Sequence, residues 1–526
     1  MHHAEPVVLL LVLVAGLVIL ANKWAIPYPV LLVLAGLVLG LVPRLPVIRL
    51  DPNLVLFFFL PPLLYPAALF TSWRDFSRNL RPILFLAIGL VLLTMTVVAW
   101  VAHSFIAGLP WAAAFALGAI VSPPDAVAAE AVLRRLRVPA RIQAVLGGES
   151  LVNDATALVA YQFAVAAMVT GRFSLGEASL QFVLVGVGGI ALGLLVGVVM
   201  RWVQRHLDDP PVQITISLLT PFAAYLLAER CYVSGVLSTV AAGMYLGWHS
   251  TALSARTRLQ AQAFWEMIAF LLNGFIFIMI GLQLPGILHN LNQEPISRLT
   301  IYGLLVSGTV VFVRIAWVFP ATYLPRWLSP KMRARDSIPP WQHSVLIAWA
   351  GMRGVVSLAA AFALPIVLAN RQPFPGRSYI LFLTFCVILV TLVFQGLTLP
   401  ILIRKLGIKD DGLIDNEERE ARLKANEAAV DFIEQKALEE NFPEEVMARV
   451  RAEYCDRIEQ LNACCGESGN PGGEVATPIY QRLQRGALQV ERQTIISLRN
   501  SRAINDEALR HIQRDLDLAE ARLTGN

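Results

Sequence analysis

Residues 140–170 read ARIQAVLGGESLVNDATALVAYQFAVAAMVT, an apolar stretch that is long enough to cross a lipid bilayer as one helix. Glu149 and Asp154 lie in its middle, where hydrocarbon would surround the chain. A charged side chain at the centre of a bilayer costs roughly 3 kcal/mol on insertion scales. Chains accept this cost where the group binds an ion, carries a proton or is neutralised by a partner. The stretch therefore predicts a membrane helix that contains a site for ions.

The same apolar character extends over most of the chain. Hydrophobic residues make up 56% of the sequence and charged residues 15%, whereas about a quarter of an average soluble domain is charged. Apolar runs fill residues 1–408, and residues 409–526 are rich in Glu, Lys and Arg. Helices satisfy their own backbone groups in lipid. We therefore predict an all-α polytopic transmembrane domain over residues 1–408 and a small helical cytoplasmic tail over residues 409–526.

Charge and motif content exclude several other classes of protein. The net charge of +5 is typical of basic loops on the cytoplasmic side of a membrane rather than of nucleic-acid binding. The five cysteines show no metal-ligand spacing, and no nucleotide or calcium motif is present, so we expect no cofactor and no enzymatic activity. The first apolar run, about residues 6–20, has no Lys or Arg before it, and we interpret it as a retained first span.

Thirteen apolar stretches recur along the chain, and the basic residues between them indicate the topology. With the N-terminus outside, the inner loops hold most of the Lys and Arg, including the clusters at 134–141 and 326–335. This asymmetry predicts thirteen spans in a cell inner (plasma) membrane, with the N-terminus outside and the C-terminus in the cytoplasm. The stretches are residues 5–22, 27–43, 53–70, 82–107, 111–133, 140–170, 178–203, 212–229, 232–248, 262–286, 299–324, 342–369 and 378–403.

Two of these spans contain residues that break a helix. The fifth span holds Ser122-Pro123-Pro124-Asp125, and the twelfth holds Gly351-Met352-Arg353-Gly354. Consecutive prolines remove backbone donors and open a helix. The two spans are seven apart, so they cross the membrane in opposite directions. This is typical of inverted repeats with one discontinuous helix in each half, whose freed carbonyls and helix ends form ion sites near the midplane.

Three motifs in this order resemble a known family. SPPDAVA at residues 122–128, GESLVND at 148–154 and GMRGVVS at 351–357 are similar to the motifs of NhaP/NHE-type sodium/proton antiporters, in particular the bacterial form with a helical cytoplasmic tail. The resemblance covers the whole membrane part and, more loosely, the tail. It implies alternating access, in which a bundle with spans 5, 6 and 12 moves against a scaffold, and a homodimer.

Asp154 is the main candidate for ion and proton binding. A carboxylate can hold either a proton or an alkali cation, and competition for one site couples the two ions. Burial in an apolar setting favours the protonated form of a carboxyl group, which allows proton exchange near the working pH. The resemblance assigns the matching Asp the same role. Asn153 precedes it, and in the family an Asn-Asp pair goes with electroneutral exchange, so we expect one proton to exchange for one monovalent cation.

The other candidate ligands of the cation lie beside the first break and on the same helix as Asp154. By resemblance, Asp125 and the backbone of Pro124 belong to a Na⁺ site; Asp125 could equally be a helix N-cap. Ser150 lies one turn before Asp154 on the same face, where its hydroxyl can bind a cation or its own backbone. We expect Na⁺ at Asp154, Asp125 and Ser150.

Glu149 and Arg353 are predicted to form a structural ion pair, because a buried arginine cannot lose its proton and needs a compensating charge. The family pairs the matching residues. Two positions depart from the family pattern: Pro66 replaces an acidic residue that many relatives have, and Gly148 stands where relatives often have Glu. These departures leave the cation selectivity open.

The sequence as a whole predicts a secondary antiporter that exchanges Na⁺, or alternatively Li⁺ or K⁺, for H⁺ across the lipid bilayer. A K⁺/H⁺ antiporter is the nearest alternative. A gated cation channel or a membrane sensor is the alternative of another class, although channels favour rings of charges or carbonyls. Nothing indicates a nucleic-acid partner. The tail is expected either to aid assembly or to sense pH or a ligand.

Overall fold

The structure is a computed structural model of the chain, and it describes most of the membrane part and two segments of helix beyond it. The described residues are 4–24, 26–42, 55–133, 136, 138–171, 174–250, 253–289, 291, 294–328, 338–368, 372–408, 413–439, 444–463, 489–491, 493–495, 497, 501, 516 and 518.

The chain divides into two compact units, Met1–Asp411 and Gly412–Asn526. In the second unit, two helices rich in charged residues pack against each other: α22 (Leu413–Glu439) and α23 (Glu444–Ala463). An ion pair joins them, in which Arg451 Nη2 lies 2.8 Å from Glu434 Oε1. Both side chains are about half exposed, so this pair contributes little to stability.

The first half of the membrane unit is built of helices, two of which include π-helical segments marked η. They are α1 (Ala4–Trp24), α2 (Tyr28–Gly40), η1 (Val55–Phe59), α4 (Leu60–Leu69), α5 (Trp73–Arg78), α6 (Leu80–Leu84), η2 (Phe85–Leu90), α7 (Val91–Phe105), α8 (Trp111–Val121), α9 (Ala126–Leu133) and α10 (Ala140–Thr170).

The second half continues in the same way. Its elements are α11 (Leu175–Arg205), α12 (Pro210–Arg230), α13 (Gly235–Trp248), α14 (Ala255–Leu282), α15 (Leu284–His289), α16 (Ile296–Leu328), α18 (Trp341–Trp349), α19 (Val355–Phe362), α20 (Arg377–Val390), η4 (Thr391–Gln395) and α21 (Gly396–Lys405).

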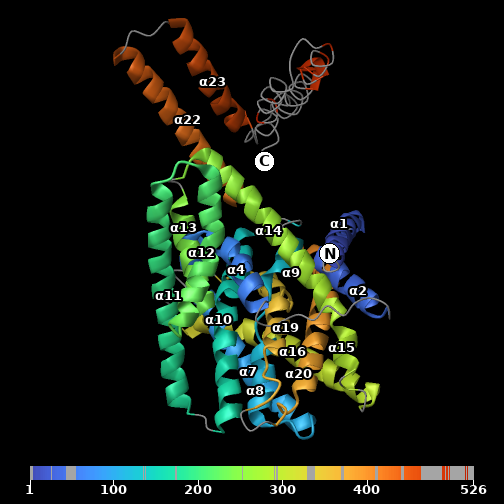
Figure 1. Cartoon of the computed structure of the whole chain (residues 1–526). Coiled ribbons are helices and arrows are strands. Elements are labelled where there is room, and N and C mark those ends of the chain that lie inside the picture. Colours follow the sequence, from blue (N-terminus) through green and yellow to red (C-terminus); the bar gives the residue numbers. More distant parts are fainter. Residues whose placement is uncertain are drawn as a thin grey trace. The chain divides into compact units, whose positions relative to one another are not determined.

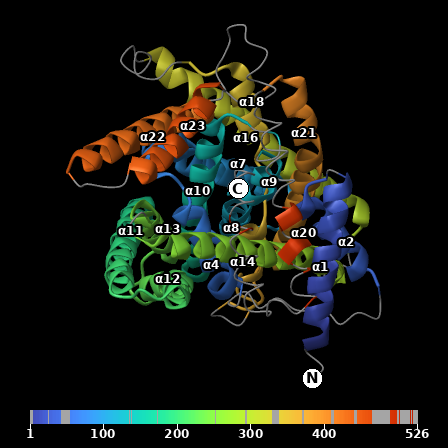
Figure 2. The same cartoon turned by 90° about the horizontal axis from the view of Figure 1, so that it is seen from above.

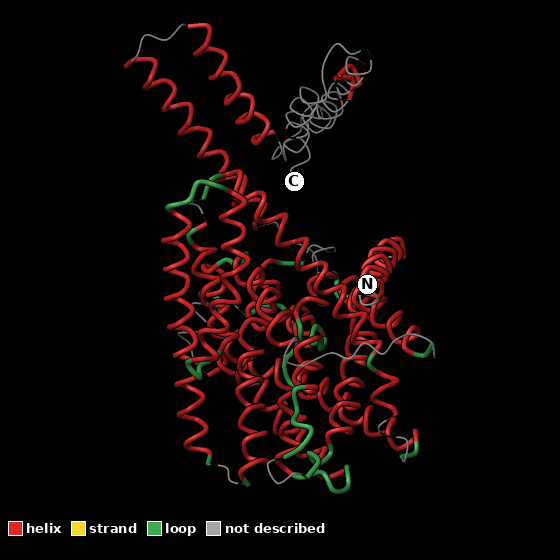
Figure 3. The backbone as a smooth tube through the Cα atoms, viewed as in Figure 1, coloured by secondary structure: helices red, strands yellow, loops and turns green. Residues whose placement is uncertain are grey.

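The all-helical membrane fold expected from the sequence is confirmed. Within the described residues there is no strand beyond a single bridge between Val367 and Pro373 (Figure 3). In the part of the chain that the structure describes, seven helices or runs of joined helices are long and apolar enough to cross a membrane. Each of the thirteen predicted stretches coincides with one helix or with adjoining helices.

Local sequence signals set where several membrane helices begin. Ser174, Ser234 and Ser254 are the N-caps of α11, α13 and α14, and each serine hydroxyl accepts a hydrogen bond from the backbone N–H three residues later. Such caps satisfy one of the N–H groups that the first turn of a helix leaves free. The long apolar spans therefore start at defined residues.

The helices of the membrane unit form two neighbouring groups. On one side α11, α12 and α13 pack together, and both views show them side by side (Figures 1 and 2). In the other group α8 lies between α7 and α10, and α19 and α20 also pack on α8. The long helix α14 packs along α2 and also contacts α12 and α4. The largest hydrophobic core surrounds α8 and α20, so the two helix breaks lie inside the protein.

Candidate functional site

Two interrupted helices meet in the centre of the membrane unit, as the sequence predicts. The helical backbone stops at Val121 and resumes at Ala126, and it stops again at Trp349 and resumes at Val355. The two breaks are joined directly, because the backbone N–H of Asp125 donates to the carbonyl oxygen of Met352 at 2.7 Å. This hydrogen bond fixes the crossing of α8–α9 with α18–α19.

Arg353 occupies the crossing and is fully buried. Its Nε donates to the carbonyl oxygen of Val121 at 3.1 Å, Nη2 donates to that of Ser122 at 3.4 Å, and Nη1 donates to that of Gly351. These carbonyls lie at the C-terminal ends of α8 and α18, which carry partial negative charge and where the carbonyl oxygens of the last turn lack intrahelical donors. The backbone N–H of Arg353 donates to Thr391 Oγ1 at 3.1 Å. The positive charge and the N–H groups of Arg353 therefore compensate the partial negative charge and the free carbonyls at two helix ends.

The predicted ion pair between Glu149 and Arg353 is wrong, because Glu149 pairs with Arg314 of α16. Arg314 Nη1 lies 2.6 Å from Glu149 Oε1, and Nη2 lies 2.8 Å from Oε2. Both side chains are buried. Arg314 also donates from Nε and Nη2 to the carbonyl oxygen of Ile347 near the end of α18. A planar guanidinium matches a carboxylate in this two-pronged geometry.

The prediction is wrong because a carboxylate is not the only group that can satisfy a buried arginine. The carbonyls of a broken helix are an alternative acceptor, and they leave Glu149 for another arginine. Arg314 had a signal of its own, since it is a lone charge within the apolar stretch 299–324. The pair still links α10 to the broken helix, through the carbonyl oxygen of Ile347.

Asp154 has a different environment, although it lies only five residues after Glu149 on α10. It is 6% exposed. Among the described residues, no group donates a hydrogen bond to its carboxylate and no basic side chain pairs with it. A second carboxylate, that of Asp125, is close enough to act on it electrostatically. A buried carboxylate without a partner has to be neutralised by something that is not part of the protein.

Asp125 lies against the start of the second broken helix. It directly precedes α9, and a Cβ atom added to Gly354 would overlap its carboxylate. The N-terminal ends of helices carry partial positive charge, which stabilises an acidic side chain there. The crossing thus places an arginine at two C-terminal helix ends and an aspartate at two N-terminal ones.

Asn153 and Pro124 are brought into direct contact. Asn153 Nδ2 donates to the carbonyl oxygen of Pro124 at 2.9 Å. Asn153 is fully buried, and its Oδ1 has no hydrogen-bond partner in the described part of the chain. Ser150 is half-buried on α10, one turn before Asp154. All five candidate ion-site positions therefore lie on α10 or at the first break.

The two departures from the family pattern have a structural context. Pro66 is buried inside α4, so no carboxylate enters from that position. A Cβ atom added to Gly148 would lie 3.2 Å from Phe76 Cδ2 and still closer to the side chain of Ile83. A glutamate at position 148 would therefore displace the packing between α10 and α5–α6.

The sequence did not single out several buried polar side chains that lack a partner in the described part of the chain, among them Thr94, Thr384, Gln395 and Ser357. Gln395 in η4 is fully buried, and neither atom of its amide has a partner among the described residues. The hydroxyl of Ser357 in α19 is buried without a partner in the same sense. The signal in each case was a single uncharged polar residue in an apolar span, which is too common in membrane helices to distinguish them.

The fold and the site define the class of the protein: a secondary transporter with inverted repeats and two discontinuous helices that cross beside a buried carboxylate. A sequence model described as "Sodium/hydrogen exchanger, transmembrane" matches residues 9–405. The chain belongs to this family of Na⁺/H⁺ exchangers, which are transporters rather than enzymes.

Similar proteins extend this assignment over nearly the full chain. A Mycobacterium tuberculosis protein named an uncharacterized Na⁺/H⁺ exchanger is 37% identical over 98% of this chain and 96% of its own. A Bacillus pumilus protein named a sodium, potassium, lithium and rubidium/H⁺ antiporter is 35% identical over 83% of this chain and 66% of its own. The structure of the sodium proton antiporter MjNhaP1 from Methanocaldococcus jannaschii matches 77% of this chain and 98% of its own with a TM-score of 0.60 at 22% identity, which shows the same fold.

Proposed function

We propose that the protein is an electroneutral Na⁺/H⁺ antiporter in which Na⁺ and H⁺ compete for the carboxylate of Asp154. The observation that carries this proposal is the environment of Asp154, which is buried beside the helix crossing and has no hydrogen-bond donor or basic partner among the described residues. A cation or a proton neutralises such a group equally well. Because only one of them can do so at a time, binding of one releases the other.

The residues on α10 and at the first break offer further oxygen atoms of the kind that binds an alkali cation. We assign Asp125, Ser150 and the carbonyl oxygen of Pro124 as further ligands of Na⁺. A carbonyl oxygen has two lone pairs, and Asn153 uses one of those on Pro124, so the other remains for the ion. Asn153 then positions the carbonyl, and its own Oδ1 is a further oxygen at the site.

Electroneutral exchange follows from the number of groups that change state. Asn153 is uncharged in both states, and Asp125 is stabilised as an anion by the helix N-termini at the crossing. If Asp154 alone alternates between proton and Na⁺, one positive charge moves in each direction per cycle. The membrane voltage then does not affect the equilibrium of exchange.

Transport itself requires that the site open to each side in turn. We propose that the bundle of α8–α9, α10 and α18–α19 moves against a scaffold of the remaining helices, and that the protein is a homodimer in the cell inner (plasma) membrane. In this arrangement the N-terminus is outside, and the tail from residue 409 onward is cytoplasmic, where it aids assembly or regulates exchange. The hydrogen bond between Asp125 and Met352 supports movement of both broken helices as one body.

The transported cation has one specific alternative. The Bacillus pumilus relative is named for exchange of potassium, lithium and rubidium as well as sodium, so K⁺/H⁺ exchange is the second candidate function. The two differ only in the spacing and number of the oxygen ligands around Asp154.

The test is cation-driven proton movement in proteoliposomes that contain a pH-sensitive dye. Na⁺, Li⁺ and K⁺ are added separately to vesicles with the wild type or with Asp154→Asn. We expect a response to Na⁺ that is unchanged when the membrane voltage is clamped and absent in the variant. Exchange at the wild-type rate in Asp154→Asn would refute the mechanism, and cation flux that is independent of the proton gradient would indicate a channel.

A further inference from the structure

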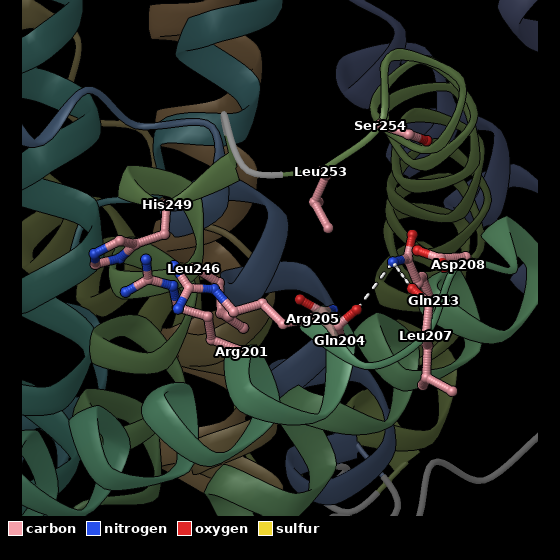
Figure 4. A pocket seen from close by; sticks show the side chains of 10 residues that line it. All are labelled: Arg201, Gln204, Arg205, Leu207, Asp208, Gln213, Leu246, His249, Leu253 and Ser254. Atoms are coloured by element: carbon pink, nitrogen blue, oxygen red, sulfur yellow. Dashed lines mark hydrogen bonds between the residues drawn. The ribbon is translucent and has the colours of Figure 1, made fainter.

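A second polar site lies well away from the helix crossing, where four helices end. The C-terminal ends of α11 and α13 and the N-terminal ends of α12 and α14 enclose a cavity of about 180 Å³ (Figure 4). This is smaller than the pockets that hold drug-sized ligands. Its lining residues are Arg201, Gln204, Arg205, Leu207, Asp208, Gln213, Leu246, His249, Leu253 and Ser254.

The charges in this cavity are separated. Figure 4 shows Arg201, Arg205 and His249 gathered on one side, whereas Asp208 lies on the other side beside Gln213. Neither arginine is paired with Asp208, and Arg205 has no hydrogen-bond or ion-pair partner within the described part of the chain. The two arginines and the aspartate leave a net charge of +1 in the lining, before any contribution from His249.

The other two basic side chains are held in place and keep donors for a ligand. Arg201 Nη1 donates to the hydroxyl of Tyr245 at 3.2 Å, and its buried Nε has no partner among the described residues. The guanidinium also lies 6.0 Å from the centre of the Tyr245 ring. His249 Nδ1 donates to the carbonyl oxygen of Tyr245 at 2.8 Å, an ordinary hydrogen-bond distance. This contact leaves His249 Nε2 for another molecule.

A hydrogen-bonded frame holds the opposite wall together. Gln213 Nε2 donates to the carbonyl oxygens of Gln204 at 3.0 Å and Leu207 at 2.5 Å. Gln213 Oε1 accepts from Thr257 Oγ1 at 2.8 Å, in the first turn of α14. Ser254, the N-cap of α14, lines the cavity. The positive end of a 28-residue helix therefore adds to the field of the arginines.

Aromatic side chains indicate that the cavity lies at the level of the lipid headgroups. Trp202 and Trp248 are next in sequence to Arg201 and His249, and they are 64% and 58% exposed. Trp73 contacts Trp248, with their ring centres 6.3 Å apart. Tryptophan is enriched where a membrane meets water. The adjoining apolar surface of α11, which includes the exposed Val198 and Val199, is the part that would face the acyl chains.

We propose that this cavity binds the phosphate group of an anionic phospholipid headgroup. A phosphodiester carries one negative charge, which balances the net charge of the lining. Arg201 and Arg205 supply charge-assisted donors, His249 Nε2 and the N-terminus of α14 add further polar contacts, and the tryptophans flank the entrance at headgroup depth. The site is separate from the proposed ion site, so its occupancy does not depend on which cation is exchanged.

The test compares two variants of the full-length protein that lose the same charge on the same side of the molecule. Arg205→Gln removes a lining arginine that makes no hydrogen bond or ion pair with described residues, so the fold should be kept. Arg256→Gln is the control, because Arg256 is exposed in the first turn of α14 but does not line the cavity. Melting temperature is followed in detergent with choline chloride while phosphatidylglycerol, phosphatidylcholine or inorganic phosphate is titrated.

We expect phosphatidylglycerol to stabilise the wild type and Arg256→Gln equally, and its apparent Kd to be about tenfold weaker in Arg205→Gln, which corresponds to about 1.4 kcal/mol. Competition by inorganic phosphate at matched ionic strength would mean that the cavity takes the phosphate group from either source. Stabilisation by the lipid alone would assign the headgroup as the source. Equal binding of phosphatidylcholine and phosphatidylglycerol, or equal weakening in both variants, would overturn the proposal.

Discussion

Glu149 and Asp154 are two buried carboxylates on one helix, and they differ in what the protein provides for them. Glu149 receives two hydrogen bonds from Arg314, whereas Asp154 receives none from the described residues. One helix thus carries a buried carboxylate with a permanent ion-pair partner and, five residues later, a buried carboxylate without one among the described residues. Burial of a charged group therefore does not by itself indicate function. Burial of a charged group without a partner does indicate a functional role.

The strongest test of this contrast is to remove the charge of Glu149. Glu149→Gln leaves Arg314 buried without its carboxylate, and breaking a buried ion pair in this way costs about 3–5 kcal/mol. We expect a large fall in the melting temperature of the purified protein and in the amount of folded protein. Glu149→Gln combined with Arg314→Met removes both charges and should recover much of the loss. If the double variant is no more stable than Glu149→Gln alone, the loss of stability does not come from the unpaired charge of Arg314.

Asp154→Asn should change the melting temperature in the opposite direction. It neutralises a carboxylate that nothing in the described protein stabilises, so the fold should lose no stability and should gain up to about 1–3 kcal/mol. The melting temperature should be measured at alkaline pH in a choline salt, where neither protons nor transported cations neutralise Asp154 in the wild type. A loss as large as that of Glu149→Gln would mean that Asp154 has a structural partner.

Two glycines at the second break allow the surroundings of Asp154 and of Glu149 to be perturbed separately. A Cβ atom at Gly354 would overlap the carboxylate of Asp125, and one at Gly351 would overlap the side chain of Arg314. We therefore expect Gly354→Ala to raise the KM for the cation about tenfold, or about 1.4 kcal/mol, with a smaller effect on melting. Gly351→Ala should mainly lower the melting temperature. Exchange rates at varied cation concentration and thermal unfolding of both variants distinguish these outcomes, and the reverse pattern would contradict the assignment.

The smallest expected effect concerns the hydrogen bond between Asn153 and Pro124. Asn153→Ala removes a buried side-chain donor to a carbonyl, which is worth about 1 kcal/mol. Melting should fall slightly, and the KM for the cation should rise because the carbonyl of Pro124 is no longer held in place. Thr156→Ala is a matched control, because it removes a buried side-chain donor to a carbonyl oxygen of the same helix, that of Val152, and keeps the hydrogen bond between Asn153 and Pro124. An unchanged KM in Asn153→Ala would argue against Pro124 as a ligand.

Much of the crossing could be predicted because its signals are local. Pro123-Pro124 and Gly351 with Gly354 are residues that interrupt helices wherever they occur, and a charge in an apolar span is visible in a single sequence. The helices and the two breaks follow from these signals, whereas the placement of Asp125 beside α10 came from the resemblance to the family. The sequence of α10 itself places Ser150, Asn153 and Asp154 within about one turn without any tertiary information.

The partners of the buried charges could not be predicted in the same way. Glu149 and Arg314 are 165 residues apart, and their contact depends on how α10 packs against α16. Arg353 binds main-chain carbonyls, which no side-chain pattern reveals. The basic residues Arg201 and Arg205 had a sufficient explanation in the charge asymmetry of membrane loops, so nothing in the sequence indicated that they line a cavity.

The contact between Arg353 and Val121 has a consequence for how the protein is made. The guanidinium follows its acceptor by 232 residues. At about 5–20 residues per second, synthesis takes roughly 10–50 s to cover that distance. Throughout this interval the end of α8 is in the translocon or the bilayer without its native donor. The helix crossing is therefore completed only when α18 and the residues up to Arg353 have been synthesised, and a ribosome that stalls before residue 353 leaves a nascent chain in which the end of α8 lacks its native donor.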